Sequence, residues 1–326
     1  MSTVPVTPPA SSPSKPTRPD PYQLVTDLII AHLEKGVVPW RCPWNREVGR
    51  PRNFHTGRPY RGVNVMLLGC RFAASPWWLT FNQAKERGGH IRKGSKGAVI
   101  IKYGTTTPRR GEEPPPAPKE ENTSEASLAR QKGGRFLRTF VVFNAAQIEG
   151  IAFPETTAQA RLTADQRLAE AERILAEMPQ RPTVNEGAGT RAFYRPATDE
   201  IEMPPFTAFD CAEGYYNTLF HELVHATGHA SRLNRETLTR HDCFGGEMYS
   251  QEELVAEMGA AFVGMEADIV RDDHEQSAAY LKSWLTVLKD KDHRRWIIQA
   301  AAQASRAADF ILNRQEPASA PSPAAG

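Results

Sequence analysis

Cysteine is scarce in this sequence, and the cysteines present are not paired at short spacing. Cys42, Cys70, Cys211 and Cys243 are scattered along 326 residues and form no C-x-x-C motif. Thiolate zinc sites and disulfide frameworks both depend on closely or regularly spaced cysteines. The sequence therefore argues against both kinds of site.

Long apolar runs are also missing. No stretch approaches the roughly eighteen apolar residues of a membrane-spanning helix. Residues 1–19 are rich in proline, serine and threonine, so they do not resemble the apolar core of a signal peptide. We therefore expect a soluble, cytoplasmic protein with no membrane partner.

The net charge of +2 conceals an uneven distribution of charge along the chain. Between residues 20 and 104, fourteen Lys or Arg residues stand against five Asp or Glu residues, an excess of nine positive charges. A basic region of this kind is typical of nucleic-acid binding, and less often of binding to an anionic membrane. The N-terminal half is therefore expected to bind nucleic acid.

Length and composition predict an α+β fold with two domains. We expect a small mixed α/β domain over residues 20–153, a linker over residues 154–164, and a second domain over residues 165–313 with a mainly helical C-terminal part. Proline-rich or low-complexity composition predicts disorder in an arm (1–19), an insertion (104–134) and a tail (314–326).

Hydrophobic periodicity places the main elements. Helices are expected over residues 21–36, 63–72, 81–87, 164–178, 250–266, 275–288 and 293–312. Strands are expected over residues 98–103 and 136–143, so the insertion interrupts a hairpin. A turn at residues 196–199 predicts a second hairpin, formed by residues 191–194 and 200–203.

The strongest motif is the H-E-x-x-H sequence formed by His221, Glu222 and His225. Histidines four residues apart lie on one face of a helix, so both imidazoles can bind one metal ion. Apolar neighbours predict a buried helix, and Gly228 offers it a natural end. Zinc suits two histidines and one carboxylate with an open position, and we therefore predict one Zn²⁺ ion.

The third ligand must come from elsewhere in the chain. Ser231 occupies the position where the longer H-E-x-x-H-x-x-G-x-x-H motif has its last histidine. Glu253 and Glu257 are four residues apart on a predicted helix and share one face. By analogy with thermolysin-like enzymes, Glu253 is the expected ligand and Glu257 orients a ligating histidine. Glu257 stays open as an alternative ligand, and both could be solvated acids.

These residues predict hydrolysis with Glu222 as the general base. Zinc lowers the pKa of water and polarises a carbonyl, and a strand beside the metal helix commonly aligns an extended peptide. An oxyanion donor is also needed. Tyr215, Tyr216, His229 and Arg232 are close enough in sequence to supply it, and nothing selects among them.

Cationic and aromatic residues are interleaved in the basic region, a composition suited to single-stranded nucleic acid. Cations bind phosphates, and aromatic faces stack on bases regardless of sequence. The candidates are Trp40, Arg41, Trp44, Arg52, Tyr60, Arg61, Arg92, Lys93 and Lys96. The alternative is that tryptophans such as Trp40 belong to the core and that the basic face is merely solvated.

Longer motifs occur in a fixed order along the chain. They include GRPYRGVN at residues 57–64 and RKG at residues 92–94, followed by FHELVHATGH at residues 220–229 and EELVAE at residues 252–257. Over roughly residues 20–312 the sequence resembles the ArdC-type antirestriction proteins of conjugative plasmids. The resemblance implies an N-terminal single-stranded-DNA-binding domain and a C-terminal zincin-like metallopeptidase domain, which together guard plasmid DNA from restriction endonucleases.

Three functions are compatible with these features. The first is an antirestriction protein of a mobile element that binds single-stranded DNA and carries a zinc metallopeptidase-like domain. The second is a DNA-associated zinc metalloprotease that cleaves DNA-bound proteins, with a restriction enzyme as one possible substrate. The third is a non-enzymatic DNA-binding scaffold in which zinc only braces the fold.

Overall fold

The computed structural model describes residues 20–40, 48–105, 135–155, 162–239, 247–269 and 278–314. Several predictions made from the sequence lie outside these ranges. They concern the arm, nearly all of the insertion, most of the linker, nearly all of the tail, and the candidate residues Arg41 and Trp44. No helix among the described residues combines the length and apolar character that a membrane span requires.

The N-terminal part is built on a four-stranded sheet with the strand order β1-β2-β5-β4. β1 and β2 pair in parallel, and the other pairs are antiparallel. A short pair, β3 with β6, lies beside this sheet. The strands are β1 (Arg52–Asn53), β2 (Trp77–Thr80), β3 (His90–Ile91), β4 (Ala98–Thr105), β5 (Arg135–Asn144) and β6 (Ile148–Glu149).

Three helices, α1 (Pro21–Leu33), α2 (Val63–Gly69) and α3 (Phe81–Glu86), accompany this sheet. The side chain of Asp20 caps α1, and Thr80 caps α3 in a capping box with Gln83. The predicted hairpin on either side of the insertion is confirmed, because β4 and β5 pair from Ala98 with Val142 to Thr105 with Arg135.

The C-terminal part combines a small sheet with a layer of helices. The strands β7 (Thr183–Glu186), β8 (Phe193–Arg195) and β9 (Glu200–Met203) pair in the order β7-β9-β8, so β8 is an edge strand. The predicted hairpin is confirmed, since β8 and β9 are antiparallel. The helices are α5 (Ala164–Glu177), α6 (Ala212–Thr227), α7 (Glu236–Thr239), α8 (Glu247–Ala267), α9 (Ala278–Leu288) and α10 (Trp296–Ile311).

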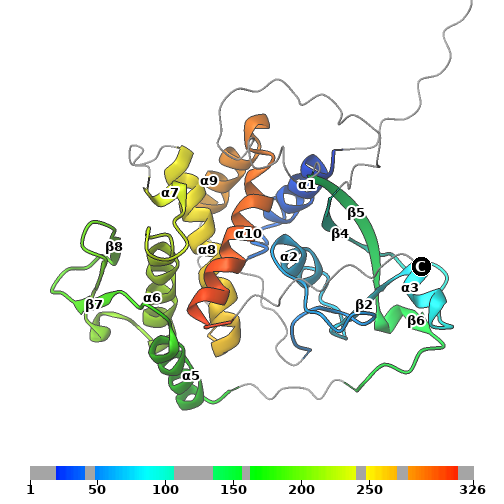
Figure 1. Cartoon of the computed structure of the whole chain (residues 1–326), viewed down its shortest axis with the longest axis horizontal. Coiled ribbons are helices and arrows are strands. Elements are labelled where there is room, and N and C mark those ends of the chain that lie inside the picture. Colours follow the sequence, from blue (N-terminus) through cyan, green and yellow to red (C-terminus); the bar gives the residue numbers. More distant parts are fainter. Residues whose placement is uncertain are drawn as a thin grey trace, which may run out of the picture.

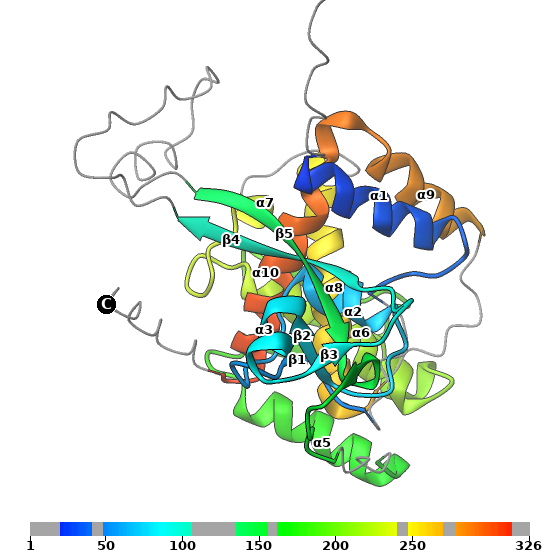
Figure 2. The ribbon, with the colours of Figure 1, turned by 90° about the vertical axis from the view of Figure 1, so that its right-hand side faces the viewer.

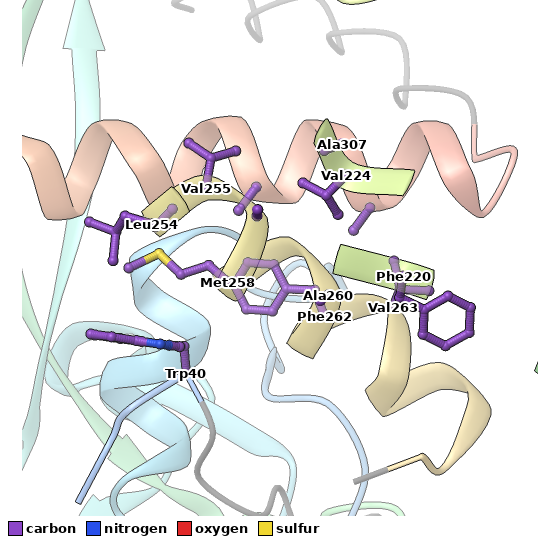
Figure 3. Packing of buried hydrophobic residues seen from close by; sticks show 14 of the residues in the cluster. Trp40, Phe220, Val224, Leu254, Val255, Met258, Ala260, Phe262, Val263 and Ala307 are labelled. Atoms are coloured by element: carbon purple, nitrogen blue, oxygen red, sulfur yellow. The ribbon is translucent and has the colours of Figure 1, made fainter. Parts of the chain in front are cut away.

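The helices α6, α8 and α10 lie side by side through the middle of the molecule (Figure 1). Their contact is apolar, with Val224 of α6, Val255 of α8 and Ala307 of α10 in one buried cluster (Figure 3). Gly259 allows α6 and α8 to approach closely, because a Cβ atom at this position would lie 2.7 Å from the side chain of Val224. This close approach brings residues of α8 within reach of the histidines on α6.

The hydrophobic core is continuous between the two parts. Residues of α1 and Trp40 belong to the same cluster as residues of α8, α9 and α10. Figure 3 shows Trp40 near Met258 of α8. The ring of Trp40 packs edge-on against that of Trp284, with centroids 5.8 Å apart, and the Thr26 hydroxyl donates to the Arg294 carbonyl at 2.8 Å. The first helix therefore packs into the helical layer of the C-terminal part.

Candidate metal centre

The helix α6 places the two motif histidines together. Its apolar residues, among them Phe220 and Leu223, are buried in the core, while His221 and His225 point to one side of the helix. The Nε2 atoms of the two histidines are 3.2 Å apart. Both imidazoles can therefore bind the same ion.

The helix α8 supplies a carboxylate at the same point. The Oε2 atom of Glu253 lies 3.4 Å from Nε2 of His221, and its Oε1 atom lies 3.6 Å from Nε2 of His225. Zinc bonds of about 2.0–2.2 Å place tetrahedral ligand atoms roughly 3.3–3.6 Å apart, so this donor set fits a single ion. Among the described residues, the group suited to a metal comprises these three and does not include Glu257, which lies about 6 Å further along the helix axis.

Glu252 contacts the other side of His225. Its Oε1 atom lies 3.3 Å from Nδ1 of His225, and the carboxylate is almost fully buried. This contact fixes the ring with Nε2 directed toward Glu253. The sequence assigned an orienting role to Glu257 and did not identify Glu252, which the packing of α8 on α6 turns toward His225.

Arg235 completes the network behind the centre. Its Nη2 atom lies 2.5 Å from Glu252, and the same atom donates to the carbonyl of Val224 at 2.6 Å. Burial alone would raise the pKa of Glu252, but the charge of Arg235 and the hydrogen bonds from His225 and Arg235 outweigh it and hold the pKa at about 2. Glu252 is therefore ionised at neutral pH.

Burial lowers the pKa of His225, whereas it raises that of a carboxyl group. The hydrogen bond and the charge of Glu252, together with the charges of Glu253 and Glu222, outweigh burial. The pKa of His225 is therefore raised. These carboxylates favour positive charge at the centre, which also suits a bound cation.

The ligand set opens into a cavity of about 450 Å³. Glu222 is 7 % exposed and lines this cavity together with His221, His225 and Glu253. Ala192, Phe193 and Tyr194, in and next to the edge strand β8, form another wall. The metal ligands, the carboxylate of Glu222 and the edge strand β8 therefore border one cavity.

Tyr249 is a cavity residue that sequence reasoning missed. It stands on α8 four residues before Glu253, lines the cavity and hydrogen-bonds to Glu253. Burial, then the charge of Glu253, raises its pKa to about 12, so it is a protonated donor at neutral pH. A tyrosine one turn before the carboxylate ligand was the available signal.

None of the four expected oxyanion donors lines this cavity. The hydroxyl of Tyr215 lies 3.5 Å from Glu186, and that of Tyr216 donates to Glu172. His229 contacts Ser231. The structure thus directs these side chains to other partners.

Arg232 instead connects the end of α6 to the small sheet. Its guanidinium donates to the Ala226 carbonyl at 2.7 Å, to Oδ2 of Asp199 at 2.9 Å and to the Tyr194 hydroxyl at 3.2 Å. Asp199 lies in the turn between β8 and β9. Arg232 therefore positions the edge strand relative to the metal helix.

The residues predicted to bind nucleic acid fall into distinct environments. Trp40 is 0 % exposed, so its ring has no free face for a base and that prediction is wrong. Tyr60 packs against the core, and Arg61 forms an ion pair with Asp309 of α10. The side chains of Arg52, Arg92, Lys93 and Lys96 are exposed, the last three in the turn between β3 and β4.

Comparison with known protein families identifies both parts of the chain. Residues 169–303 match a family model described as a zincin-like metallopeptidase, and residues 19–143 match the N-terminal domain of the anti-restriction factor ArdC. The predicted α+β fold with two domains, the second zincin-like, is therefore confirmed.

Solved structures narrow this class to a family. The chain is similar to the antirestriction ArdC protein from the R388 plasmid in a metal-free crystal structure, with 35 % identity, a TM-score of 0.65, and coverage of 91 % of this chain and 100 % of that one. A Mn(II)-bound structure of the R388 protein matches with 34 % identity, a TM-score of 0.65, and coverage of 90 % and 97 %. The chain belongs to the ArdC antirestriction family.

A longer relative shares the same region. The chain is 35 % identical to the DNA primase TraC of Escherichia coli over 298 residues, which is 89 % of this chain and 27 % of TraC. The chain thus spans about a quarter of that relative's length.

Proposed function

We propose that this protein is an antirestriction protein of a mobile element that acts in the cytoplasm. In this proposal it binds single-stranded DNA, holds one zinc ion at His221, His225 and Glu253, and protects incoming DNA from host restriction. The observation that carries the proposal is the convergence of these three side chains, at separations that fit one ion, on a cavity that Glu222 also lines.

The arrangement supports hydrolysis of a peptide bond. A zinc ion in this donor set would act as a Lewis acid that polarises a carbonyl and acidifies water. Glu222 accepts the proton of the attacking water, and its position next to His221 on α6 keeps it in the same cavity. Tyr249, also in the cavity, hydrogen-bonds to Glu253 and would hold this carboxylate in place as a ligand.

The cavity favours a catalytic centre over a structural brace. Structural zinc sites are closed by four protein ligands, whereas catalytic sites keep one position open. Among the residues that the structure describes, three protein ligands converge at the wall of an open cavity. The edge strand β8 beside it offers backbone groups that can pair with an extended peptide, so a protein such as a restriction enzyme is the supported substrate class.

The test is protection of plasmid DNA during transfer into a restricting host, with wild type compared with Glu222→Gln. Both proteins are first shown to hold zinc and to bind a single-stranded oligonucleotide equally. We expect the variant to lose protection, because a general base contributes about 10²- to 10⁴-fold to rate. Full protection by Glu222→Gln would assign antirestriction to DNA binding alone and make the zinc a brace.

A further inference from the structure

The β4–β5 hairpin carries exposed aromatic and cationic side chains that the sequence analysis did not single out. Phe136, Arg138 and Phe140 alternate along β5 and therefore share one face of the strand. Lys102 of β4 lies directly opposite Arg138 in the cross-strand register. We call these four residues the hairpin stripe. The two strands extend together beyond the rest of the sheet (Figure 2).

The two cations of the hairpin stripe face each other. Like charges directly opposite in an antiparallel pair destabilise the pairing. The sequences of β4 and β5 contain no Asp or Glu, and neither Lys102 nor Arg138 has an acidic partner among the residues that the structure describes. A phosphate-bearing ligand would remove this repulsion.

The two aromatic residues of the hairpin stripe have different roles: Phe136 contacts Arg138, and Phe140 has an exposed ring. A Cβ atom at Gly104 would lie 2.3 Å from the ring of Phe136, so this ring lies directly over the opposite strand. The guanidinium of Arg138 sits over the same ring, 4.5 Å from its centroid. Phe140 is 38 % exposed, although its cross-strand partner Ile100 is buried. Packing over Gly104 explains the position of Phe136. It does not explain why Phe140 is exposed or why Lys102 and Arg138 face each other.

A second Phe-x-Arg sequence in the chain shows the contrasting case. On β8, Arg195 also lies over the ring of Phe193, at 5.2 Å. Its directly opposite residue on β9 is Glu200, which forms an ion pair with it at 3.3 Å. The same local motif is therefore neutralised within the fold on β8 and faces another cation on β5.

We propose that the hairpin stripe is a binding site for single-stranded nucleic acid. Lys102 and Arg138 bind adjacent phosphates, the ring of Phe136 holds Arg138 in place, and the exposed ring of Phe140 stacks on a base. In a duplex the faces of the bases are already covered by their neighbours, so the ring of Phe140 selects a single strand. The exposed turn with Arg92, Lys93 and Lys96 precedes β4 in the chain, and the buried Ala98 and Ile100 separate it from Lys102 on this face of the strand. The inference rests on the proposed single-stranded-DNA binding and locates it.

The experiment measures binding of full-length protein to a fluorescent oligothymidylate by anisotropy over a series of salt concentrations. We expect the double variant Lys102→Gln, Arg138→Gln to bind at least tenfold more weakly near 0.1 M salt. Its slope of log K against log salt should fall by about 1.4, or about 0.7 for each phosphate that the protein no longer neutralises. Phe140→Ala should bind at least about fivefold more weakly with the slope unchanged, since it removes a stacking surface and no charge.

Arg195→Gln is the matched control, because it removes an arginine that lies over a phenylalanine and is neutralised by Glu200; its binding should equal that of wild type. Circular dichroism confirms that each variant is folded. If wild type binds and both stripe variants bind equally well, the hairpin stripe is not the site, while DNA binding by the protein stands. Tighter binding to a duplex of the same length overturns the single-strand assignment. No binding by wild type overturns the proposed function itself, and the hairpin stripe with it.

Discussion

Charged side chains are neutralised by partners behind the metal centre, whereas two cations face each other in the hairpin stripe. Behind the metal centre, Glu252 is buried and contacts both His225 and Arg235. On the hairpin, Lys102 lies opposite Arg138 with no acid in either strand. A charge that is neutralised inside the fold has a structural role, whereas the facing cations on the hairpin are the basis of the proposed phosphate contact.

The same distinction separates the residues predicted to bind nucleic acid. Arg61 is an ion-pair partner of Asp309, which ties the segment before α2 to α10. Arg92, Lys93 and Lys96 are exposed in one turn. Composition alone treats all four cations alike, and only the fold shows which of them is neutralised.

The largest effect is expected from the metal ligand itself. Glu253→Ala removes a carboxylate that lies 3.4 Å from His221, so zinc affinity should fall by more than the roughly 10- to 100-fold that the loss of an outer partner costs. Glu257→Ala is the matched control and should keep the ion at wild-type affinity. Metal content after dialysis against a chelator measures both. Loss of zinc from Glu257→Ala with retention in Glu253→Ala would reverse the assignment.

Glu252→Ala should be the most destabilising change that leaves all three ligands in place. It leaves the buried guanidinium of Arg235 without its carboxylate, and removal of one partner from a buried ion pair costs about 3–5 kcal/mol. Urea unfolding of chelator-treated protein measures this loss in the free energy of unfolding. Glu252→Gln, which keeps the shape and hydrogen-bonding atoms, should lose less. A loss below about 1 kcal/mol in Glu252→Ala would show that the network is not structural.

The sequence predicted the parts of this centre that are local to one element. Histidines four residues apart identify one face of a helix, and hydrophobic periodicity predicted a helix beginning at residue 81, where α3 begins. The role of Glu252 depends on how α8 is rotated against α6, which the close contact at Gly259 helps to set. A sequence pattern contains no information on that rotation, so it did not identify Glu252.

Contacts between residues far apart in the chain could not be predicted from the sequence either. Trp40 lies in a basic, aromatic stretch and was a candidate for stacking on bases, with the core as the alternative; its ring packs against Trp284, far along the chain. The pairing of Arg61 with Asp309 joins residues that are similarly distant. The hairpin stripe was missed because facing cations are recognised only once the register of β4 and β5 is known.

A smaller effect is expected from the ion pair between Arg167 and Glu213, which joins α5 to α6 and is partly exposed. The hydrogen bond from Arg167 holds the pKa of Glu213 below its ordinary value of 4.5. Because the folded pKa is the lower one, the pair stabilises the fold above about pH 4.5, and this contribution is lost as the pH falls through the folded pKa.

Comparing wild type with Glu213→Gln isolates this contribution. The difference in the free energy of unfolding should be at most about 1 kcal/mol at pH 7 and should vanish in acid. Urea unfolding at a series of pH values measures it. A difference that grows in acid would contradict the sign.

The smallest effect, and the sharpest test of the contrast between neutralised and facing cations, is expected from Arg61→Gln. Since Arg61 already has Asp309 as its counter-charge, its removal should change affinity for single-stranded DNA by less than about twofold and leave the salt slope unaltered. Stability should fall by no more than about 1 kcal/mol, as for other partly exposed ion pairs. Anisotropy and urea unfolding on the same preparation measure both quantities. If Arg61→Gln weakens DNA binding as strongly as the loss of Arg138, then an ion pair within the fold does not exclude a phosphate contact, and the exposed turn and hairpin stripe lose their distinction from the rest of the basic region.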